Sequence, residues 1–311
     1  MVENPVLFIT FVRPEYARKS WDAIKAAQPK TLYFYSNKGR ADKEGEIERN
    51  EEIRSYIKEI DWDCDLHTWF REETVDVYKS LFGAISWLFE NEEQGIILEE
   101  DCVASLAFFD YCDQLLPKYK DDYRIWMISG DNYFEDKLEI NYDYFFSQSF
   151  QIYGWASWRT RWNQIDWDKG IDFNALFDEK VIEANIRNRK CQKAYIKDLN
   201  NLRDFIERTR CWDMTFNIYG KLNNALAIVP SSNLVENVGL SGSHSGQEKK
   251  GWNNVAVTYS QRSYNTQRYP RFVAPYLQYD IIAFKEQYIK VYGLYYRIIG
   301  KTKAIIHSII N

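Results

Sequence analysis

Residues 95–102 read Gly95-Ile96-Ile97-Leu98-Glu99-Glu100-Asp101-Cys102, a short apolar run that ends in three consecutive carboxylates. The run is short, rich in isoleucine and opened by glycine, which predicts a buried strand. Three adjacent acids repel one another, so a buried strand end tolerates them only beside something positive. Open α/β sheets present ligand groups at such strand ends. The triplet therefore favours a divalent cation that carries a phosphate ligand, with an acidic surface turn as the simpler alternative.

Predicted strands and helices alternate on both sides of this stretch. Before it, runs of β-forming residues predict strands at 5–11, 31–35 and 66–70, and apolar residues at helical spacing predict a helix after each strand. After it we expect a helix capped by Ser105, strands at 125–129, 144–146 and 225–229, a loop at 153–158, and helices within 172–210 and from Cys211 onward. This order predicts an α/β fold with a mostly parallel, doubly wound sheet flanked by helices.

The composition is that of an ordinary globular chain of 311 residues, with 45% hydrophobic and 27% charged residues. A net charge of −5 argues against a general nucleic-acid-binding surface. The aromatic share is high, at 17%, and large flat side chains suit stacking on bases and sugar rings as well as core packing. The five cysteines form no CxxC pair and their number is odd, which argues against a disulfide framework and favours a reducing cytosol.

The two ends of the chain bear on its location. The first residues lack the basic start and apolar core of a signal peptide, and no apolar run is long enough to span a bilayer, which predicts a cytoplasmic protein. Residues 279–311 mix aromatic, aliphatic and basic residues, which predicts a basic amphipathic helical tail. Such a tail either packs back onto the domain or lies on the inner face of a membrane as a peripheral contact.

Three common nucleotide and hydrolase motifs are missing from the sequence. It has no Gly-x-x-x-x-Gly-Lys-Ser/Thr loop, which disfavours a P-loop NTPase. It has no Gly-x-Gly-x-x-Gly after the first strand, which argues against a dinucleotide dehydrogenase, and no Gly-x-Ser-x-Gly elbow of an α/β hydrolase. Group transfer from a nucleotide-activated donor is the chemistry that remains.

Four features in order resemble the N-acetylglucosaminyltransferase I family and its bacterial relatives, which are glycosyltransferases of the GT-A fold. They are an opening strand followed by Arg13, the Leu98-Glu99-Glu100-Asp101 motif with Phe108-Phe109 downstream, Gly154-Trp155 before Trp158 and Trp162, and Trp212-Asp213 followed by Asn233-Leu234-Val235 and residues 239–244. The resemblance covers about residues 5–246. Two departures are Glu100, where the family usually has Asp, and the single acid after Trp212, where the family has two.

The resemblance implies residues for the metal and the nucleotide. Asp101 would ligate Mn²⁺ or Mg²⁺ through oxygen, and His244 would approach the metal or the diphosphate from a closing loop. The metal would act as a Lewis acid on the leaving diphosphate. Glu100 would bind the ribose and Glu99 would lie near base and ribose. With Asn37 in the polar loop after the second strand and Lys79 on a helix near the triplet, the candidate nucleotide-binding residues are Arg13, Asn37, Lys79, Glu99 and Glu100.

The resemblance also implies residues on the acceptor side. Asp213 would be the general base that deprotonates the acceptor hydroxyl in an inverting displacement. From the residues themselves, Trp155 could stack on a sugar ring, with Gly154 allowing close approach, and Asp131 at a strand end could bind acceptor hydroxyls.

Most of these residues have a simpler interpretation. His244 could be an exposed loop residue, Asp213 an acid that favours a helix N-terminus, Arg13 a surface partner of Glu15, and Lys79 a solvated side chain. Trp155 could equally belong to the core, and Asp131 could cap its own loop.

Together these observations predict a metal-dependent, inverting glycosyltransferase of hexosyl or N-acetylhexosaminyl type. It would use a UDP-sugar donor and a glycan or lipid-linked saccharide acceptor, in surface polysaccharide biosynthesis. We expect a catalytic domain at 1–246, with a nucleotide-sugar half at 1–130 and an acceptor half at 131–246, then an irregular linker or closing segment at 247–278 and the helical tail at 279–311. A nucleotidyltransferase and a non-catalytic carbohydrate-binding protein stay open as alternatives.

Overall fold

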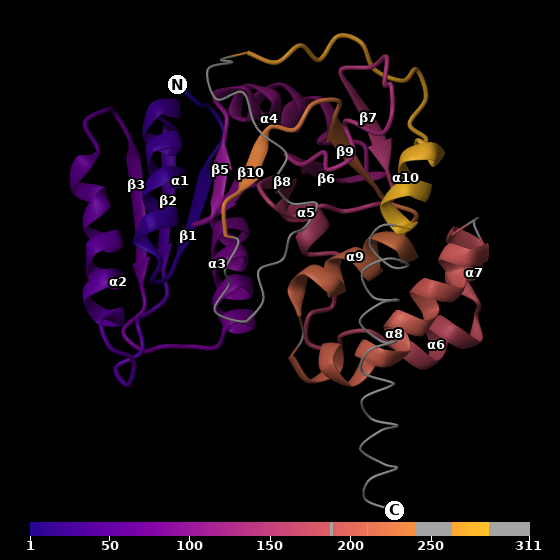
Figure 1. Cartoon of the computed structure of the whole chain (residues 1–311), viewed down its shortest axis with the longest axis horizontal. Helices are drawn as coiled ribbons and strands as arrows, with labels where there is room; N and C mark the ends of the chain where they lie inside the picture. The colour runs from indigo at the N-terminus through magenta and orange to yellow at the C-terminus, as the bar shows by residue number, and fades with distance from the viewer. Residues whose placement is uncertain (187–188, 210, 240–262, 286–311) are drawn as a thin grey trace, which may run out of the picture.

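The computed structural model describes residues 1–186, 189–209, 211–239 and 263–285. Its centre is an eight-stranded sheet in the order β3-β2-β1-β4-β8-β6-β9-β7 (Figure 1). Its strands are β1 (Val6–Thr10), β2 (Thr31–Ser36), β3 (Asp65–Phe70), β4 (Gln94–Glu99), β6 (Ile125–Ser129), β7 (Tyr144–Ser147), β8 (Trp155–Trp158) and β9 (Leu226–Pro230). Strands β3, β2, β1 and β4 run parallel, as do β6 and β9, whereas β8 and β7 run antiparallel to their neighbours. The predicted α/β fold with a mostly parallel, helix-flanked sheet is confirmed.

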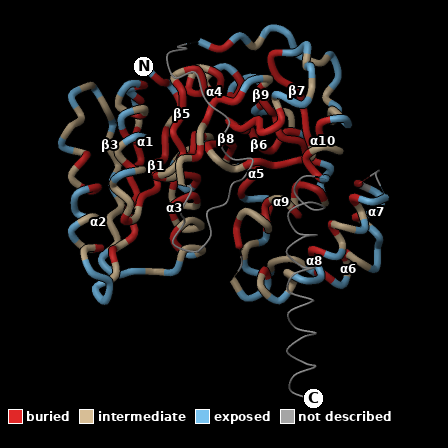
Figure 2. The backbone as a smooth tube through the Cα atoms, viewed as in Figure 1, coloured by how far each residue is buried: buried red, intermediate tan, exposed pale blue. Residues whose placement is uncertain are grey.

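Helices cover both faces of the sheet. Phe8 of β1 lies in a core shared with α1 (Pro14–Ala27), α2 (Glu46–Arg54), the short helix η1 (Ser55–Glu59) and α4 (Leu106–Tyr119). Leu7 and Ile9 point to the opposite face and lie in a core shared with α3 (Val77–Asn91), α5 (Arg159–Trp162) and α9 (Trp212–Leu222). Figure 2 shows that the strands between these helices are mostly buried. A ligand can therefore reach the sheet at its strand ends but not at its faces.

A separate group of helices follows α5. It consists of α6 (Phe173–Asp178), α7 (Val181–Asn185) and α8 (Arg189–Thr209), at the lower right of Figure 1. The apolar residues Tyr195, Leu199 and Ile206 of α8 are buried in a core of this group. Their spacing places them on one helix face, as the sequence predicts, so the helical prediction for 172–210 is confirmed over the described residues.

The prediction of a loop at 153–158 is wrong, because Trp155–Trp158 forms β8 in the middle of the sheet. Trp155 pairs with Ile97 of β4 on one side and with Ser129 of β6 on the other. The strand is only four residues long and follows a glycine, so its hydrophobic pattern is too short to reveal a period. By running antiparallel between β4 and β6, it joins the first four strands of the sheet to the last three.

A two-stranded ribbon that we did not predict follows the acid triplet. Strand β5 (Cys102–Ala104) pairs antiparallel with β10 (Val235–Asn237). Beyond β10, the backbone N–H of Val238 donates to the carbonyl oxygen of Asp101 at 2.9 Å. Gly239 then lies so close to Asp101 that a Cβ atom at this position would overlap Asp101 Oδ2. The chain after β9 thus crosses the end of β4, where glycine is required.

The start of the predicted tail packs on the domain. Helix α10 (Leu277–Phe284) lies beside β7, and the buried hydroxyl of Tyr279 accepts a hydrogen bond from Gln151 Nε2 at 2.7 Å. Residues 286–311, the rest of the tail, lie outside the described residues. Within the described ranges, no helix combines the length and the apolar character needed to cross a bilayer.

Candidate functional site

The acid triplet lies at the carboxyl end of β4 and meets Arg13, which follows β1. Arg13 Nε donates to Glu100 Oε1 at 2.6 Å, and Arg13 Nη2 lies 3.0 Å from Asp101 Oδ2. The backbone N–H of Phe11 donates to Glu100 Oε2 at 2.6 Å. Burial raises the pKa of Glu100, and the guanidinium of Arg13 opposes that rise. Arg13 is therefore the positive partner that a buried acidic strand end requires.

This arrangement bears on the ribose-binding role expected for Glu100. Its two carboxylate oxygens are both hydrogen-bonded, one to Arg13 and one to Phe11, and the residue is only 3% exposed. A ribose hydroxyl would have to share these oxygens. In this structure Glu100 ties the turn after β1 to the end of β4.

We expect Arg13→Met to lower the free energy of unfolding by about 3 kcal/mol, because it leaves Glu100 buried without its cation. Urea unfolding at pH 7 measures the loss. Arg18→Met, within α1, is the control. Arg18 is 40% exposed and pairs with Glu59, which is 33% exposed, so its loss should cost less than about 1 kcal/mol. Equal losses in the two variants would contradict the structural role of Arg13.

Negative charge at this corner exceeds what Arg13 neutralises. The carboxylate of Glu99 makes no hydrogen bond or ion pair with another described residue, and burial together with the charge of Asp101 raises its pKa to about 8. Asp213, at the start of α9, adds to this rise, so it lies within electrostatic reach of the triplet. Asp101 Oδ1 has only a contact of 3.8 Å with the Cys102 thiol. The corner thus holds carboxylate oxygens that lack a cationic partner among the described residues.

These oxygens suit a hard divalent cation. Among the described residues, no group of three or more His, Cys, Asp or Glu side chains is arranged to hold a metal ion. Mg²⁺ sites that serve phosphates commonly use one or two carboxylates, with the remaining ligands from the phosphates and water. Asp101 Oδ1, beside surplus negative charge, fits such a site on its chemistry.

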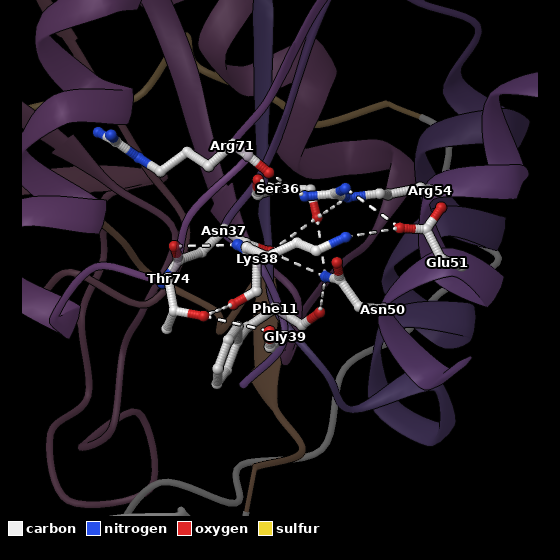
Figure 3. A network of polar contacts seen from close by, with 10 residues as sticks. All are labelled: Phe11, Ser36, Asn37, Lys38, Gly39, Asn50, Glu51, Arg54, Arg71 and Thr74. Atoms are coloured by element: carbon white, nitrogen blue, oxygen red, sulfur yellow. Dashed lines mark hydrogen bonds and ion pairs between the residues drawn. The ribbon is translucent and has the colours of Figure 1, made fainter. Parts of the chain in front are cut away.

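A polar network ties together the carboxyl ends of β1, β2 and β3 (Figure 3). Asn50 Nδ2 donates to the carbonyl oxygen of Phe11 at 2.6 Å and to that of Asn37 at 2.8 Å. Arg54 Nη2 donates to the carbonyl oxygen of Arg71 at 2.8 Å. The three turns at this edge are therefore held in one arrangement by Asn50 and Arg54, two α2 residues that the sequence analysis did not single out.

The two remaining nucleotide candidates lie along the same edge. Asn37 is buried, and its side chain joins two loops, since Nδ2 donates to the carbonyl oxygen of Val75 at 2.9 Å and Oδ1 accepts from the N–H of Val75 at 3.2 Å. The side chain of Lys79 is 78% exposed and lies 3.6 Å from Asp76 Oδ2. Asn37 thus holds two loops together at this edge of the sheet, whereas Lys79 projects into solvent at the first turn of α3.

A cavity of about 490 Å³ opens at the end of β3. Its lining residues are Trp69, Phe70, Arg71, Glu72, Glu73 and Val75. The guanidinium of Arg71 lies 4.5 Å from the centre of the Trp69 ring, and Arg71 Nε donates to the Tyr35 hydroxyl at 2.5 Å. An aromatic ring beside a fixed cation suits a planar, polar ligand. We did not predict this cavity from the sequence: its lining residues follow one another in the chain, but a hollow depends on how this segment folds after β3.

On the acceptor side, Asp131 is fully buried at the end of β6. Its Oδ2 accepts from the Tyr133 hydroxyl at 3.0 Å and from the backbone N–H of Tyr153 at 2.9 Å. Burial raises the pKa of Asp131 well above its usual range, and the hydrogen bonds from Tyr133 and Tyr153 oppose that rise. An acceptor could reach it only if Tyr133 or Tyr153 moved.

Trp155 and Gly154 lie beneath the surface of the same region. The Trp155 ring is 1% exposed and stacks on Trp212, with ring centres 5.3 Å apart. A sugar could reach this ring only if Trp212 or Phe216 moved. Gly154 has a positive φ of 70°, and a Cβ here would lie 2.7 Å from a Val235 methyl group. Gly154 therefore permits the ribbon containing β10 to pack closely.

Asp213 is half-buried in the first turn of α9, where an acid also favours the helix dipole. The thiol of Cys211 is in hydrogen-bond contact with Asp213 Oδ1. From the sequence we expected Cys211 to be a core residue at the start of a helix, and it is buried there, but we did not predict its contact with Asp213. The sequence feature that could have indicated this contact is a cysteine two residues before the predicted base. His244 lies outside the described residues, five positions after Gly239 at the Asp101 carboxylate.

No family model matches the sequence, and neither does any curated protein. Similar solved structures include the mannosyltransferase PcManGT from Pyrobaculum calidifontis, in complex with GDP-Man and Mn²⁺ (13% identity, 53% of this chain, 47% of that chain, TM-score 0.36). Another is the UTP-bound UGPase from Acinetobacter baumannii (8% identity, 76% of this chain, 88% of that chain, TM-score 0.35). A third is the glycosyltransferase GlyE from Streptococcus pneumoniae TIGR4 (13% identity, 53% of this chain, 36% of that chain, TM-score 0.27). The match spans about half of PcManGT and about a third of GlyE. TM-scores this low assign no activity.

Proposed function

We propose that this chain is a metal-dependent, inverting glycosyltransferase of the GT-A type. It transfers a hexosyl or N-acetylhexosaminyl group from a UDP-sugar to a hydroxyl of a glycan or lipid-linked saccharide. The observation that carries the proposal is the acidic corner, where Glu99, Glu100 and Asp101 meet Arg13 and lie within electrostatic reach of Asp213. Such a corner offers surplus carboxylate oxygens for a cation and a separate carboxylate for proton transfer.

The residues of this chain would act as follows. Asp213 accepts the proton of the acceptor hydroxyl. The acceptor oxygen forms a bond to the anomeric carbon while the bond from that carbon to the diphosphate oxygen breaks, and the electron pair leaves with the diphosphate. Asp101, with His244 as a second expected ligand, would hold a Mn²⁺ or Mg²⁺ ion, whose bound chemistry is Lewis-acid stabilisation of the diphosphate.

The nucleoside would lie along the edge formed by the ends of β4, β1, β2 and β3. Neighbouring strands are about 4.8 Å apart, so this edge extends about 14 Å from the acidic corner to the cavity beside Trp69. In this proposal the base occupies that cavity against Trp69 and Arg71, and Glu99 lies near the ribose. Contact of residues 286–311 with a membrane surface stays a prediction.

A donor screen tests the proposal. Thermal unfolding is measured with UDP-glucose, UDP-galactose, UDP-N-acetylglucosamine and GDP-mannose, each with and without MnCl₂. At least one UDP-sugar should raise the unfolding temperature only with the metal, since ligand at 100 times its Kd stabilises by about 2.7 kcal/mol. Trp69→Ala should weaken that binding about tenfold or more, because one base stacking on an aromatic ring contributes about 1–3 kcal/mol. Trp62→Ala, on the side of the sheet covered by α1, is the matched control and should leave it unchanged.

Turnover then separates this function from its alternatives. A glycosyltransferase releases UDP from the bound donor, slowly with water and faster with a saccharide acceptor. Formation of a nucleotide sugar from a nucleoside triphosphate and a sugar phosphate would instead identify a nucleotidyltransferase. Binding without turnover, with or without metal, would identify a carbohydrate-binding protein.

A further inference from the structure

The segment that carries Asp213 is anchored in the core by a buried tryptophan, Trp212. Trp212 is 2% exposed, stacks on Trp155 and also contacts Trp162, with ring centres 6.2 Å apart. The carbonyl oxygen of Cys211 accepts from the N–H of Thr215 at 3.0 Å, which begins α9. These contacts fix the backbone of Asp213, but they leave the rotation of its carboxylate undetermined.

Cys211 occupies the N-cap of α9, a position where Ser, Thr, Asp or Asn usually accepts a backbone N–H. Its side chain makes no such capping bond by geometry, although the backbone N–H groups of Asp213 and Met214 lie close enough to the sulfur to oppose the rise in its pKa. Instead, the Cys211 thiol is in hydrogen-bond contact with Asp213 Oδ1. Burial and the neighbouring Asp213 carboxylate raise the pKa of Cys211 above its usual range, so the sulfur retains its proton and is the donor.

We propose that Cys211 is a positioning residue for the general base, holding Asp213 Oδ1 through an S–H···O hydrogen bond and leaving Oδ2 to accept the proton of the acceptor hydroxyl. This inference rests on the proposed function of Asp213. Asp213 Oδ2 has no hydrogen bond with another described residue, so it is available to the acceptor. During transfer the proton moves from the acceptor hydroxyl to Oδ2, the acceptor oxygen bonds to the anomeric carbon, and the diphosphate leaves with the electron pair. The thiol proton stays on sulfur throughout.

The expected effect is on turnover rather than on donor binding. Losing a hydrogen bond to a charged group changes a rate about tenfold. We therefore expect Cys211→Ala to lower kcat about tenfold. The KM for the donor should stay within about twofold, since the thiol contacts neither nucleotide nor metal residues. Cys211→Ser should recover most of kcat, because a hydroxyl can accept the capping N–H and still donate to Asp213.

The experiment measures UDP release by the full-length protein with MnCl₂ and the best donor of the screen, with water or a saccharide as acceptor. Cys112→Ala is the matched control, because Cys112 is a fully buried thiol on α4, in the core on the other face of the sheet. It should keep the parent kcat. Thermal unfolding of every variant separates a loss of folded protein from a loss of turnover.

Two further comparisons separate the inference from the proposed function. If Asp213→Asn keeps the parent kcat, Asp213 is not the base and both proposals are wrong. If Asp213→Asn loses turnover while Cys211→Ala keeps it, only the positioning role is wrong. The double variant should turn over no more slowly than Asp213→Asn alone, because Cys211 acts through Asp213. Equal losses in Cys211→Ala and Cys211→Ser would also contradict the hydrogen bond.

Discussion

Asp213→Asn should lower the rate of sugar transfer about a hundred-fold to ten-thousand-fold and leave donor binding intact. A positioned general base contributes about this factor, and an amide cannot take up the acceptor proton. Asp213 is half-buried in the first turn of α9, with Oδ1 beside the Cys211 thiol. Asparagine has nearly the same shape, so the helix should persist.

Two quantities are measured for each variant. The first is kcat for UDP release with a saccharide acceptor, and the second is the metal-dependent rise in unfolding temperature with the donor. The variant should lose the first and keep the second. Asp204→Asn, an exposed acid on α8, is the matched control and should keep both. A variant at Asp213 that transfers sugar at the parent rate would remove the base assignment.

Asp101→Ala should weaken donor binding about tenfold or more in MnCl₂, and should make the remaining binding insensitive to the metal. The carboxylate offers its Oδ1 to a cation, whereas its Oδ2 already lies 3.0 Å from Arg13 Nη2. A divalent ion contributes several kcal/mol of charge stabilisation at a diphosphate, which sets the scale of the loss. The pair between Arg13 and Glu100 survives in this variant, so the fold should be retained.

Donor-dependent thermal unfolding with MnCl₂, and again with EDTA, tests this expectation. Glu90→Ala removes an exposed acid at the end of α3 and should behave like the parent. If Asp101→Ala keeps the full metal dependence, the ion is held elsewhere and the role of the triplet must be reassigned.

The sequence predicts best the features that depend on neighbouring residues. The apolar run before Glu99 indicates a buried strand with acids at its end, and β4 ends at Glu99. The same reasoning identifies the helix that begins after Cys211. Arg13 was identified as a site residue, but its contacts to Glu100 and Asp101 depend on the pairing of β1 with β4.

The sequence could not predict features that depend on distant parts of the chain. The burial of Trp155 follows from its contact with Trp212 on another element. The cavity beside Trp69 is lined by one continuous segment, but the Arg71 side chain there is held by the hydroxyl of Tyr35 on the neighbouring strand β2. The contact between Cys211 and Asp213 is local, yet it went unnoticed because cysteine is not among the residues that favour helix N-caps.

The ribbon of β5 and β10 has a consequence for the order in which the protein folds. Strands β1 to β4 can pair early, since they follow one another in the chain, but β10 comes after β9 and pairs with a strand far earlier in the sequence. Such non-local contacts form slowly, after a large loop has closed. The carbonyl group of Asp101 gains its partner, the N–H of Val238, only at that stage. A chain emerging from the ribosome would therefore complete its acidic corner late. Donor binding would then show that β10 has already paired with β5.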